Sequence, residues 1–265
     1  LPVDFAGQPA DLDRILAIAR RHRLIVVEDA AHALGARFGR SRIGALADMT
    51  VFSFHPVKHI TTGEGGMVLT NDGTFAERLR VFRHHGIVKD EQHPWQYEII
   101  ELGHNYRLTD FQCALGVSQL RKLDWRLARL KELAGCYRRM LAGVEGVSLP
   151  ALRPDRDHAW HLFVVLLQLD ALTVDRDAVI GLLRSEEIGA TVHYPLVHLH
   201  PFFRRQFGYG PGLCPVAESL VTRLVSLPLF ATMTEGDVNR VVAALVRILA
   251  LTQKRSPGLR MVGSS

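Results

Sequence analysis

Val27-Glu28-Asp29-Ala30-Ala31-His32-Ala33 and, further on, Phe52-Ser53-Phe54-His55-Pro56-Val57-Lys58 are the two stretches that decide the fold. Each continues a short apolar run, Leu24–Val27 or Met49–Phe54, and such runs predict strands buried on both faces of a parallel sheet. A third run, Met67–Thr70, follows the glycines of Gly63-Glu64-Gly65-Gly66. Asp11 precedes apolar residues with helical spacing, at Leu12, Ile15, Leu16 and Ala19. The alternation predicts an α/β fold with a mostly parallel sheet. Three or so strands are too few for it, so we expect the other strands upstream of Leu1.

The second half of the sequence has a different pattern. A long helix is predicted from Thr109 to Leu141, and Gly143, Gly146 and Pro150 follow it. Strands at 162–169 and 191–194 and helices at 175–186 and 235–251 then predict a small α+β domain, with Thr234 to Asp237 capping the last helix. We therefore expect a large domain over 1–141, a small C-terminal domain over 142–252 and a frayed tail over 253–265.

Composition narrows the class of protein. Hydrophobic residues make up 48% and charged residues 22%, which is typical of a soluble globular protein. No apolar run reaches the roughly 18 residues of a membrane span, and the three cysteines form no CxxC pair, so we expect a cytoplasmic protein without a metal site. The net charge of +5 comes without a nucleic-acid-binding motif. An anionic small substrate accounts for it better than nucleic acid does.

Chemical groups stand where two of the predicted strands end. Asp29 closes one strand, and Ser53 and Lys58 follow the other, at the edge of a parallel sheet where ligands bind. Pyridoxal phosphate needs a lysine for a Schiff base, a carboxylate for its pyridine nitrogen and donors for its phosphate. Taken singly, each residue has an ordinary explanation: a helix cap for Asp29, a surface charge for Lys58, a turn for Gly65-Gly66. Their order and spacing together favour the cofactor.

The same segments resemble the DegT/StrS-type sugar aminotransferases, which are fold-type I pyridoxal-phosphate enzymes. The resemblance continues through Gly103-His104-Asn105-Tyr106-Arg107-Leu108-Thr109-Asp110-Phe111-Gln112 and into the small domain at Val192-His193-Tyr194 and Cys214-Pro215-Val216-Ala217-Glu218. It covers roughly Leu1 to Leu251.

The resemblance implies roles for particular residues. Lys58 matches the lysine that carries the cofactor, and Asp29 matches the carboxylate facing the pyridine nitrogen. His32 stands beside the cofactor ring, and Ser53 matches a phosphate ligand. Asn105 matches an asparagine that reaches the phosphate of the neighbouring subunit, which implies a homodimer with shared active sites. In the small domain, His193 and Tyr194 match a segment near the sugar.

The resemblance also implies a reaction: transamination of a nucleotide-linked keto sugar with an amino acid donor, usually glutamate. The segments around Lys58 and His193 look most like those of the 4-aminotransferases that act on UDP-linked 4-keto-6-deoxy N-acetylhexosamines in pseudaminic acid biosynthesis. Another keto sugar and a non-catalytic fragment remain alternatives. A dehydratase branch has histidine in place of the lysine, and Lys58 argues against it.

The family's Gly-Thr/Ser turn for the phosphate and its ring-stacking aromatic residue precede the part that matches Leu1. From their absence we expect residues 1–265 alone to hold the cofactor weakly and to show no transamination, and we expect the missing segment to restore both.

Overall fold

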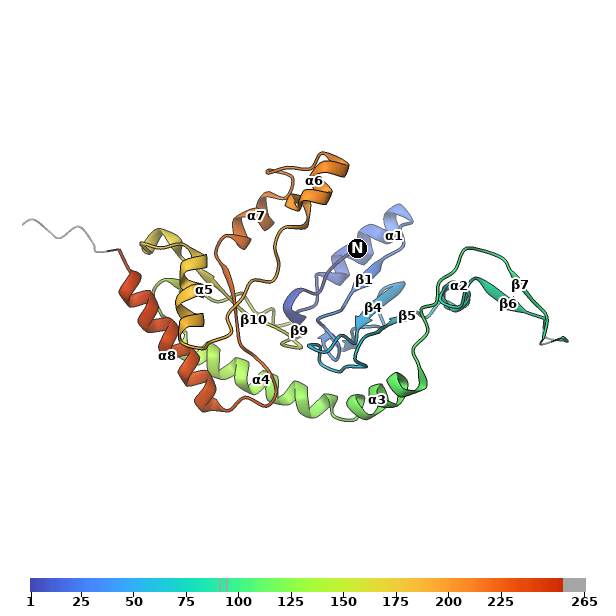
Figure 1. The fold of residues 1–265 in the computed structure, drawn as a ribbon, viewed down its shortest axis with the longest axis horizontal. Helices are drawn as coiled ribbons and strands as arrows, with labels where there is room; N and C mark the ends of the chain where they lie inside the picture. The colour runs from blue at the N-terminus through green and yellow to red at the C-terminus, as the bar shows by residue number, and fades with distance from the viewer. Residues whose placement is uncertain (91, 94, 255–265) are drawn as a thin grey trace, which may run out of the picture. The chain divides into compact units, whose positions relative to one another are not determined.

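The computed structural model describes residues 1–90, 92, 93 and 95–254. The described chain forms two compact units, drawn in Figure 1. The first contains residues 1–131 and 152–161, and the second contains residues 132–151 and everything described from Leu162 onward. The predicted domain limits, 1–141 and 142–252, stay a prediction, and most of the predicted tail, 255–265, lies outside the described residues.

The first unit is built on a sheet in the order β1-β4-β5, with β1 at Val27–Asp29, β4 at Met49–Ser53 and β5 at Gly66–Leu69. β1 runs parallel to β4, while β5 is antiparallel to it, and Figure 1 shows the three strands together beside helix α1, Leu12–His22. Leu12 from this helix, Phe52 from β4 and Ala30 beyond β1 share one buried core. This core fixes the ends of β1 and β4 in space.

Two sequence predictions for the first 141 residues are wrong. The first strand does not begin at Leu24: the side chains of Leu24 and Ile25 are 59% and 58% exposed, and the strand starts at Val27. The single helix over 109–141 is two helices, α3 (Asp110–Leu120) and α4 (Leu123–Met140). Leucine continues with helical spacing across the junction, so the periodicity gave no sign of the break.

The other elements of the first unit are short. A 3₁₀ turn, η1 (Phe5–Gly7), comes first. A small sheet has the order β3-β2-β9, with β2 at Arg37–Phe38, β3 at Ser41–Arg42 and β9 at Arg156–Asp157. Helix α2, Gly73–Phe82, leads into an antiparallel hairpin of β6, Ile87–Lys89, and β7, Tyr97–Ile99. Because β9 pairs with β2, residues 152–161 return to the first unit.

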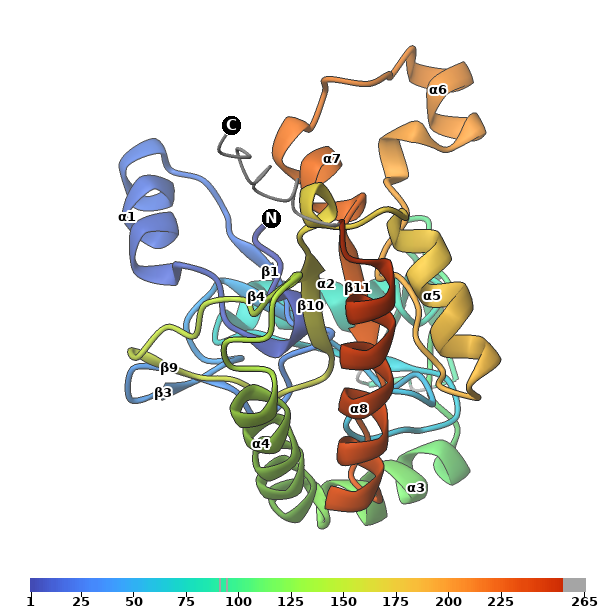
Figure 2. The same cartoon turned by 90° about the vertical axis from the view of Figure 1, so that its left-hand side faces the viewer.

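The second unit is an antiparallel sheet covered by helices. Its strand order is β11-β10-β8, with β8 at Val147–Ser148, β10 at Phe163–Leu167 and β11 at Leu224–Leu227. Helices α5, Arg176–Ser185, and α8, Glu235–Thr252, lie side by side against it, as Figure 2 shows. The remaining elements are short helices: η2 (Leu169–Ala171), η3 (Val197–Leu199), α6 (Pro201–Phe207) and α7 (Pro215–Val221).

Sequence prediction of this unit was largely confirmed. The two long helices and β10 lie where expected, and Thr234 and Asp237 form a capping box at the start of α8. The strand predicted at 191–194 is wrong. Only Thr191 makes a bridge, to Ser226 on β11, and β11 itself was not predicted. Within the part of the chain that the structure describes, no helix is both long and apolar enough to cross a membrane.

Candidate functional site

Asp29 and Lys58 lie where the two parallel strands end. In the register of β1 and β4, Asp29 stands opposite Val51, and Ser53 follows two residues later as the last residue of β4. The chain then turns, and the amide of Lys58 donates to the carbonyl of His55 at 2.9 Å. Both Asp29 and Lys58 are half-buried. A carboxylate and an amine are thus brought to the same edge of the sheet.

The glycines after Lys58 let the chain return to β4 at close range. The amide of Phe54 donates to the carbonyl of Gly65 at 2.8 Å, and that of Thr62 donates to the carbonyl of Phe54 at 3.0 Å. A Cβ at Gly66 would stand 2.7 Å from the carbonyl oxygen of Phe52, closer than side chains tolerate. The loop that carries Lys58 is therefore closed by backbone contacts that require glycine.

Burial and charge act on Lys58 in opposite directions. Burial lowers the pKa of its amine, and the negative charge of Asp29 raises it in part. The net shift is downward, which makes the neutral, nucleophilic form of the amine easier to reach. The Asp29 carboxylate is itself oriented, because Oδ1 accepts the amide of Ala31 at 3.1 Å.

His32 is buried beside the same strand end. Its Nδ1 accepts the amide of Ala6 at 3.3 Å, so in the neutral ring the proton is on Nε2. The ring lies 4.4 Å, centroid to centroid, from that of His161. The backbone at Gly7 passes close to that of His32, since a Cβ at residue 7 would lie 2.9 Å from the carbonyl oxygen of His32. Glycine permits this close approach. The imidazole is held in one orientation by backbone groups.

His59, the residue after Lys58, is the functional candidate that sequence reasoning missed. Its Nε2 lies 2.8 Å from the carbonyl oxygen of Ala159, and since a carbonyl only accepts, Nε2 carries the proton. Burial lowers the pKa of His59 to about 4, so the ring is neutral. Its position next to Lys58 was visible in the sequence. The return of residues 152–161, which buries the ring, was not.

The structure brings together four of the seven predicted site residues: Lys58, Asp29, His32 and Ser53 all lie at the end of β1 and β4. Ser53 is half-buried, and its Oγ accepts the amide of His55 at 3.4 Å. Asn105 lies elsewhere in this unit, in an isolated bridge with His84, and it is exposed. His193 and Tyr194 belong to the second unit. There, Nδ1 of His193 lies 2.9 Å from Oγ of Ser226, and Tyr194 is exposed.

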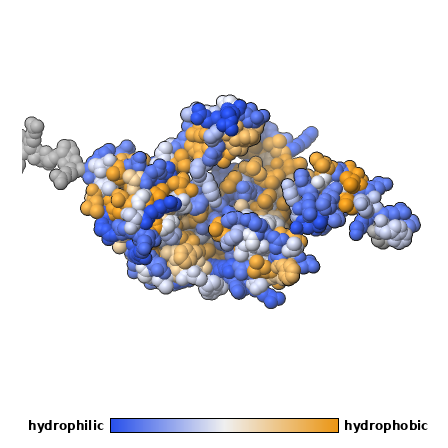
Figure 3. All heavy atoms as spheres, in the orientation of Figure 1, coloured by the Kyte–Doolittle hydropathy of each residue, from blue (hydrophilic) through white to orange (hydrophobic). Residues whose placement is uncertain are grey.

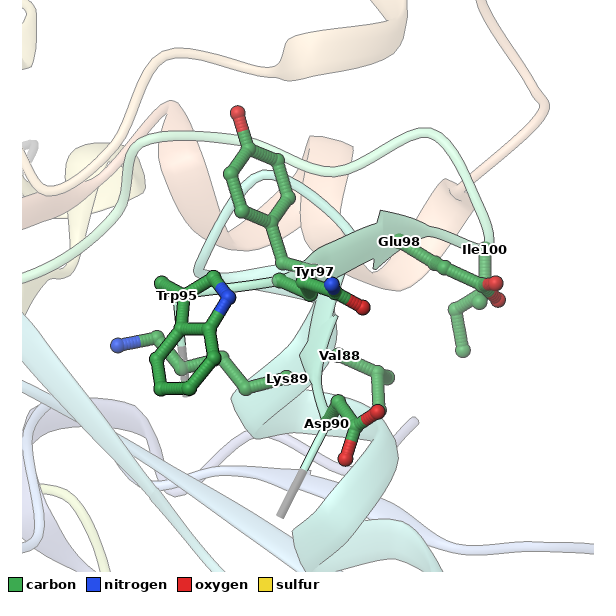
Figure 4. Close-up of a pocket in the computed structure, with 8 residues that line it drawn as sticks. Val88, Lys89, Asp90, Trp95, Tyr97, Glu98 and Ile100 are labelled. Carbon is green, nitrogen blue, oxygen red and sulfur yellow. The ribbon is translucent and has the colours of Figure 1, made fainter. Parts of the chain in front are cut away.

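An open pocket of about 690 Å³ lies on the β6–β7 hairpin. Its lining comes from both strands and the segment between them, as the labelled side chains in Figure 4 show. None of the seven predicted site residues lines it. The hairpin also exposes large apolar side chains, with Trp95 74%, Ile99 66% and Ile100 60% exposed. Orange surface in Figure 3 marks such exposed hydrophobic residues.

Comparison with known proteins decides the family. The model of the DegT/DnrJ/EryC1/StrS aminotransferase family matches residues 1–246. The chain belongs to this family. The aminotransferases of the DegT family depend on pyridoxal phosphate, and they have the fold-type I architecture that the sequence predicted. Both expectations are therefore confirmed at the level of the family.

Two individual relatives align over most of this chain. Uncharacterized protein MJ1066 of Methanocaldococcus jannaschii is 43% identical over 256 residues, which are 94% of this chain and 66% of the relative. Spore coat polysaccharide biosynthesis protein SpsC of Bacillus subtilis is 39% identical over 252 residues, or 92% and 65% of the two chains. The chain thus spans just under two thirds of these relatives' lengths.

A solved structure supports the fold. Helicobacter pylori PseC, an aminotransferase involved in the biosynthesis of pseudoaminic acid, superposes with a TM-score of 0.87 at 29% identity. The match covers 94% of this chain and 66% of PseC.

The residues at the strand ends fit pyridoxal phosphate. Lys58 offers a partly desolvated amine, Asp29 a fixed carboxylate and Ser53 a hydroxyl, and the imidazole of His32 is oriented beside them. These are the three kinds of group that the cofactor needs, with one oriented ring nitrogen in addition.

Proposed function

We propose that the protein containing this chain is a pyridoxal-phosphate-dependent aminotransferase of nucleotide-linked keto sugars. The observation that carries the proposal is that Lys58, in the loop after β4, lies near enough to Asp29 at the end of the adjacent parallel strand β1 to feel its charge, while burial lowers the pKa of Lys58. Membership of the DegT/DnrJ/EryC1/StrS aminotransferase family supports it.

Each residue has a distinct task in this proposal. Pyridoxal phosphate, when bound, supplies an electron sink for the carbon that loses and regains a proton. Lys58 holds the cofactor and, once its amine is free, carries that proton on Nζ. Asp29 keeps the proton on the pyridine nitrogen, because its negative charge stabilises the pyridinium. Ser53 donates from Oγ to the phosphate, and His32 lies beside the ring.

For the substrate we propose a UDP-linked 4-keto-6-deoxy N-acetylhexosamine, with glutamate as the amino donor. The likeness to PseC, an aminotransferase of pseudoaminic acid biosynthesis, supports a sugar of this kind. His193 and Tyr194 are the proposed sugar contacts. The surplus of basic residues, 32 against 27 acidic ones, suits an anionic nucleotide sugar.

We further propose a cytoplasmic homodimer in which Asn105 reaches the cofactor phosphate of the other subunit. The exposed position of Asn105, near a hairpin with exposed apolar side chains, supports a role at a subunit contact.

The test is an assay of the full-length protein with glutamate and a panel of nucleotide-linked 4-keto and 3-keto sugars. We expect amino transfer to the UDP-linked 4-keto-6-deoxy N-acetylhexosamine, and loss of at least about 10⁴-fold in Lys58→Ala. Lys89→Ala removes a lysine on the hairpin and is the matched control. Transfer to another sugar would show that the proposed substrate is wrong, while the proposed reaction would stand. Equal activity in parent and Lys58→Ala would refute the catalytic proposal.

A further inference from the structure

Two carboxyl groups next to Asp29 are completely buried. Asp4 and Glu28 have no solvent exposure, and each is tied to the strand that ends in Asp29. Glu28 is the residue before Asp29 on β1, while the amide of Asp4 donates to the carbonyl of Asp29 at 3.0 Å. Two buried acids in contact are costly unless their charge is reduced or paired.

Each acid has one oxygen with a donor and one without. Oδ1 of Asp4 accepts the amide of Ala10 at 2.8 Å, and Oε2 of Glu28 accepts the hydroxyl of Thr50 at 2.8 Å. Among the described residues, no donor reaches Oδ2 of Asp4 or Oε1 of Glu28. The two side chains are close enough for the charge of Glu28 to raise the pKa of Asp4. A proton between these two oxygens supplies the missing donor for both.

We propose that Asp4 and Glu28 share one proton between Oδ2 and Oε1, and that this pair positions Asp29 and preserves its negative charge. The first part concerns the buried pair alone, and the second rests on the proposed function. Three carboxylates ionised together at the end of β1 would favour protonation of one of them. The shared proton removes one of those charges, so Asp29 can stay ionised opposite the cofactor ring.

The electrostatics agree with the geometry. The pKa of Asp4 is raised to about 7, chiefly by burial; the amide of Ala10 opposes the rise, and the neighbouring Glu28 and Asp29 add to it. Burial also raises the pKa of Glu28. A carboxyl whose folded pKa is raised stabilises the fold at low pH and loses that contribution as the pH rises through the folded value.

Amide substitutions in the full-length protein test the shared proton. Asp4→Asn keeps the acceptor for Ala10 and gives Glu28 a permanent N–H donor. Glu28→Gln does the same in the other direction. The double variant instead makes two amide N–H groups face each other without an acceptor. We expect urea midpoints of the single variants close to that of the parent at pH 5.5, and a drop in the double variant well beyond the sum of the single shifts.

A pH comparison decides the matter even if the double variant does not fold. Between about pH 5 and 7 the folded parent keeps the shared proton and the unfolded chain has released it. The parent's unfolding constant should therefore rise up to ten-fold per pH unit relative to Asp4→Asn, in which an amide donor replaces that proton. A parallel pH dependence in the two proteins would overturn the proposal. So would a double variant at least as stable as either single variant, which is the outcome expected if both acids are ionised.

Cofactor affinity separates the two parts of the inference. We expect both single variants to bind pyridoxal phosphate within a few-fold of the parent, measured by fluorescence titration, since each still neutralises one carboxylate. A large loss in both would overturn the role toward Asp29. If the parent itself binds no cofactor, the proposed function fails, while the unfolding data still decide the shared proton.

Discussion

The site at the ends of β1 and β4 and the β6–β7 hairpin differ in how their side chains are held in place. Lys58, Asp29 and His32 are half-buried or buried, and backbone hydrogen bonds orient them within one unit. The hairpin exposes Trp95 and Ile99, which contribute nothing to the described core. Oriented side chains such as these can be placed by one chain. Apolar groups of the second kind are typical of surfaces that another chain covers.

Removing the charge of Asp29 should have the largest effect on the first region. Asp29→Asn keeps the shape but removes the negative charge that we propose stabilises the pyridinium, so we expect kcat to fall about 10³-fold with cofactor still bound. Steady-state assays and absorbance spectra of the full-length protein measure both. Asp13→Asn, on the exposed face of α1, is the control. Near-parental turnover in Asp29→Asn would assign the task to another group.

The buried ring of His59 should make stability depend on pH. Its folded pKa of about 4 lies below its ordinary value of 6.5, so the unfolded chain takes up a proton first as the pH falls. Stability should therefore be lost between about pH 6.5 and 4, by about 3 kcal/mol relative to His59→Gln, which does not titrate. Urea unfolding of both proteins across this range is the measurement. Equal pH dependence would mean that the folded and unfolded states bind the proton of His59 equally, so that the folded structure does not lower its pKa.

Adding one methyl group at Gly66 should disturb the contact between the Lys58 loop and β4. Gly66→Ala places a Cβ 2.7 Å from the Phe52 carbonyl oxygen, and we expect a loss of about 1–3 kcal/mol of stability. Gly73→Ala, at the start of α2, meets nothing within 4 Å and should cost nothing. Thermal unfolding compares the two. An unchanged thermal stability in Gly66→Ala would show that the loop can shift to make room for the methyl group.

Mixing of inactive variants tests the proposed subunit contact at Asn105, near the hairpin, and should give the smallest signal. A heterodimer of Asn105→Ala and Lys58→Ala chains carries both lesions in one site and leaves the other intact. A statistical mixture should regain about a quarter of parental activity if subunits share sites. Native mass spectrometry verifies the exchange. No recovery in verified heterodimers would contradict a shared site.

Local chemistry made the first region predictable from sequence. Asp29 and Ser53 end strands whose apolar runs are visible, Lys58 follows the second of them, and parallel strands bring their carboxyl ends to one edge. The α/β class and the capping box at Thr234 were equally accessible, since each depends on neighbours in sequence.

Non-local contacts account for what the sequence did not reveal. Leu24 and Ile25 were predicted to belong to a buried strand because they are apolar. Apolarity alone does not show whether other residues cover a side chain, and these two are exposed. The environments of His59 and His161 depend on residues 152–161 pairing with β2, far away in sequence. The break between α3 and α4 has no proline or glycine to mark it.

The central claim is that Lys58 holds pyridoxal phosphate. Borohydride reduction of the full-length protein with the cofactor, followed by peptide mass mapping, tests it most directly. We expect one modified peptide, containing Lys58, and no modification there in Lys58→Ala. Attachment to Lys89 or any other lysine, with Lys58 unmodified, would contradict the account.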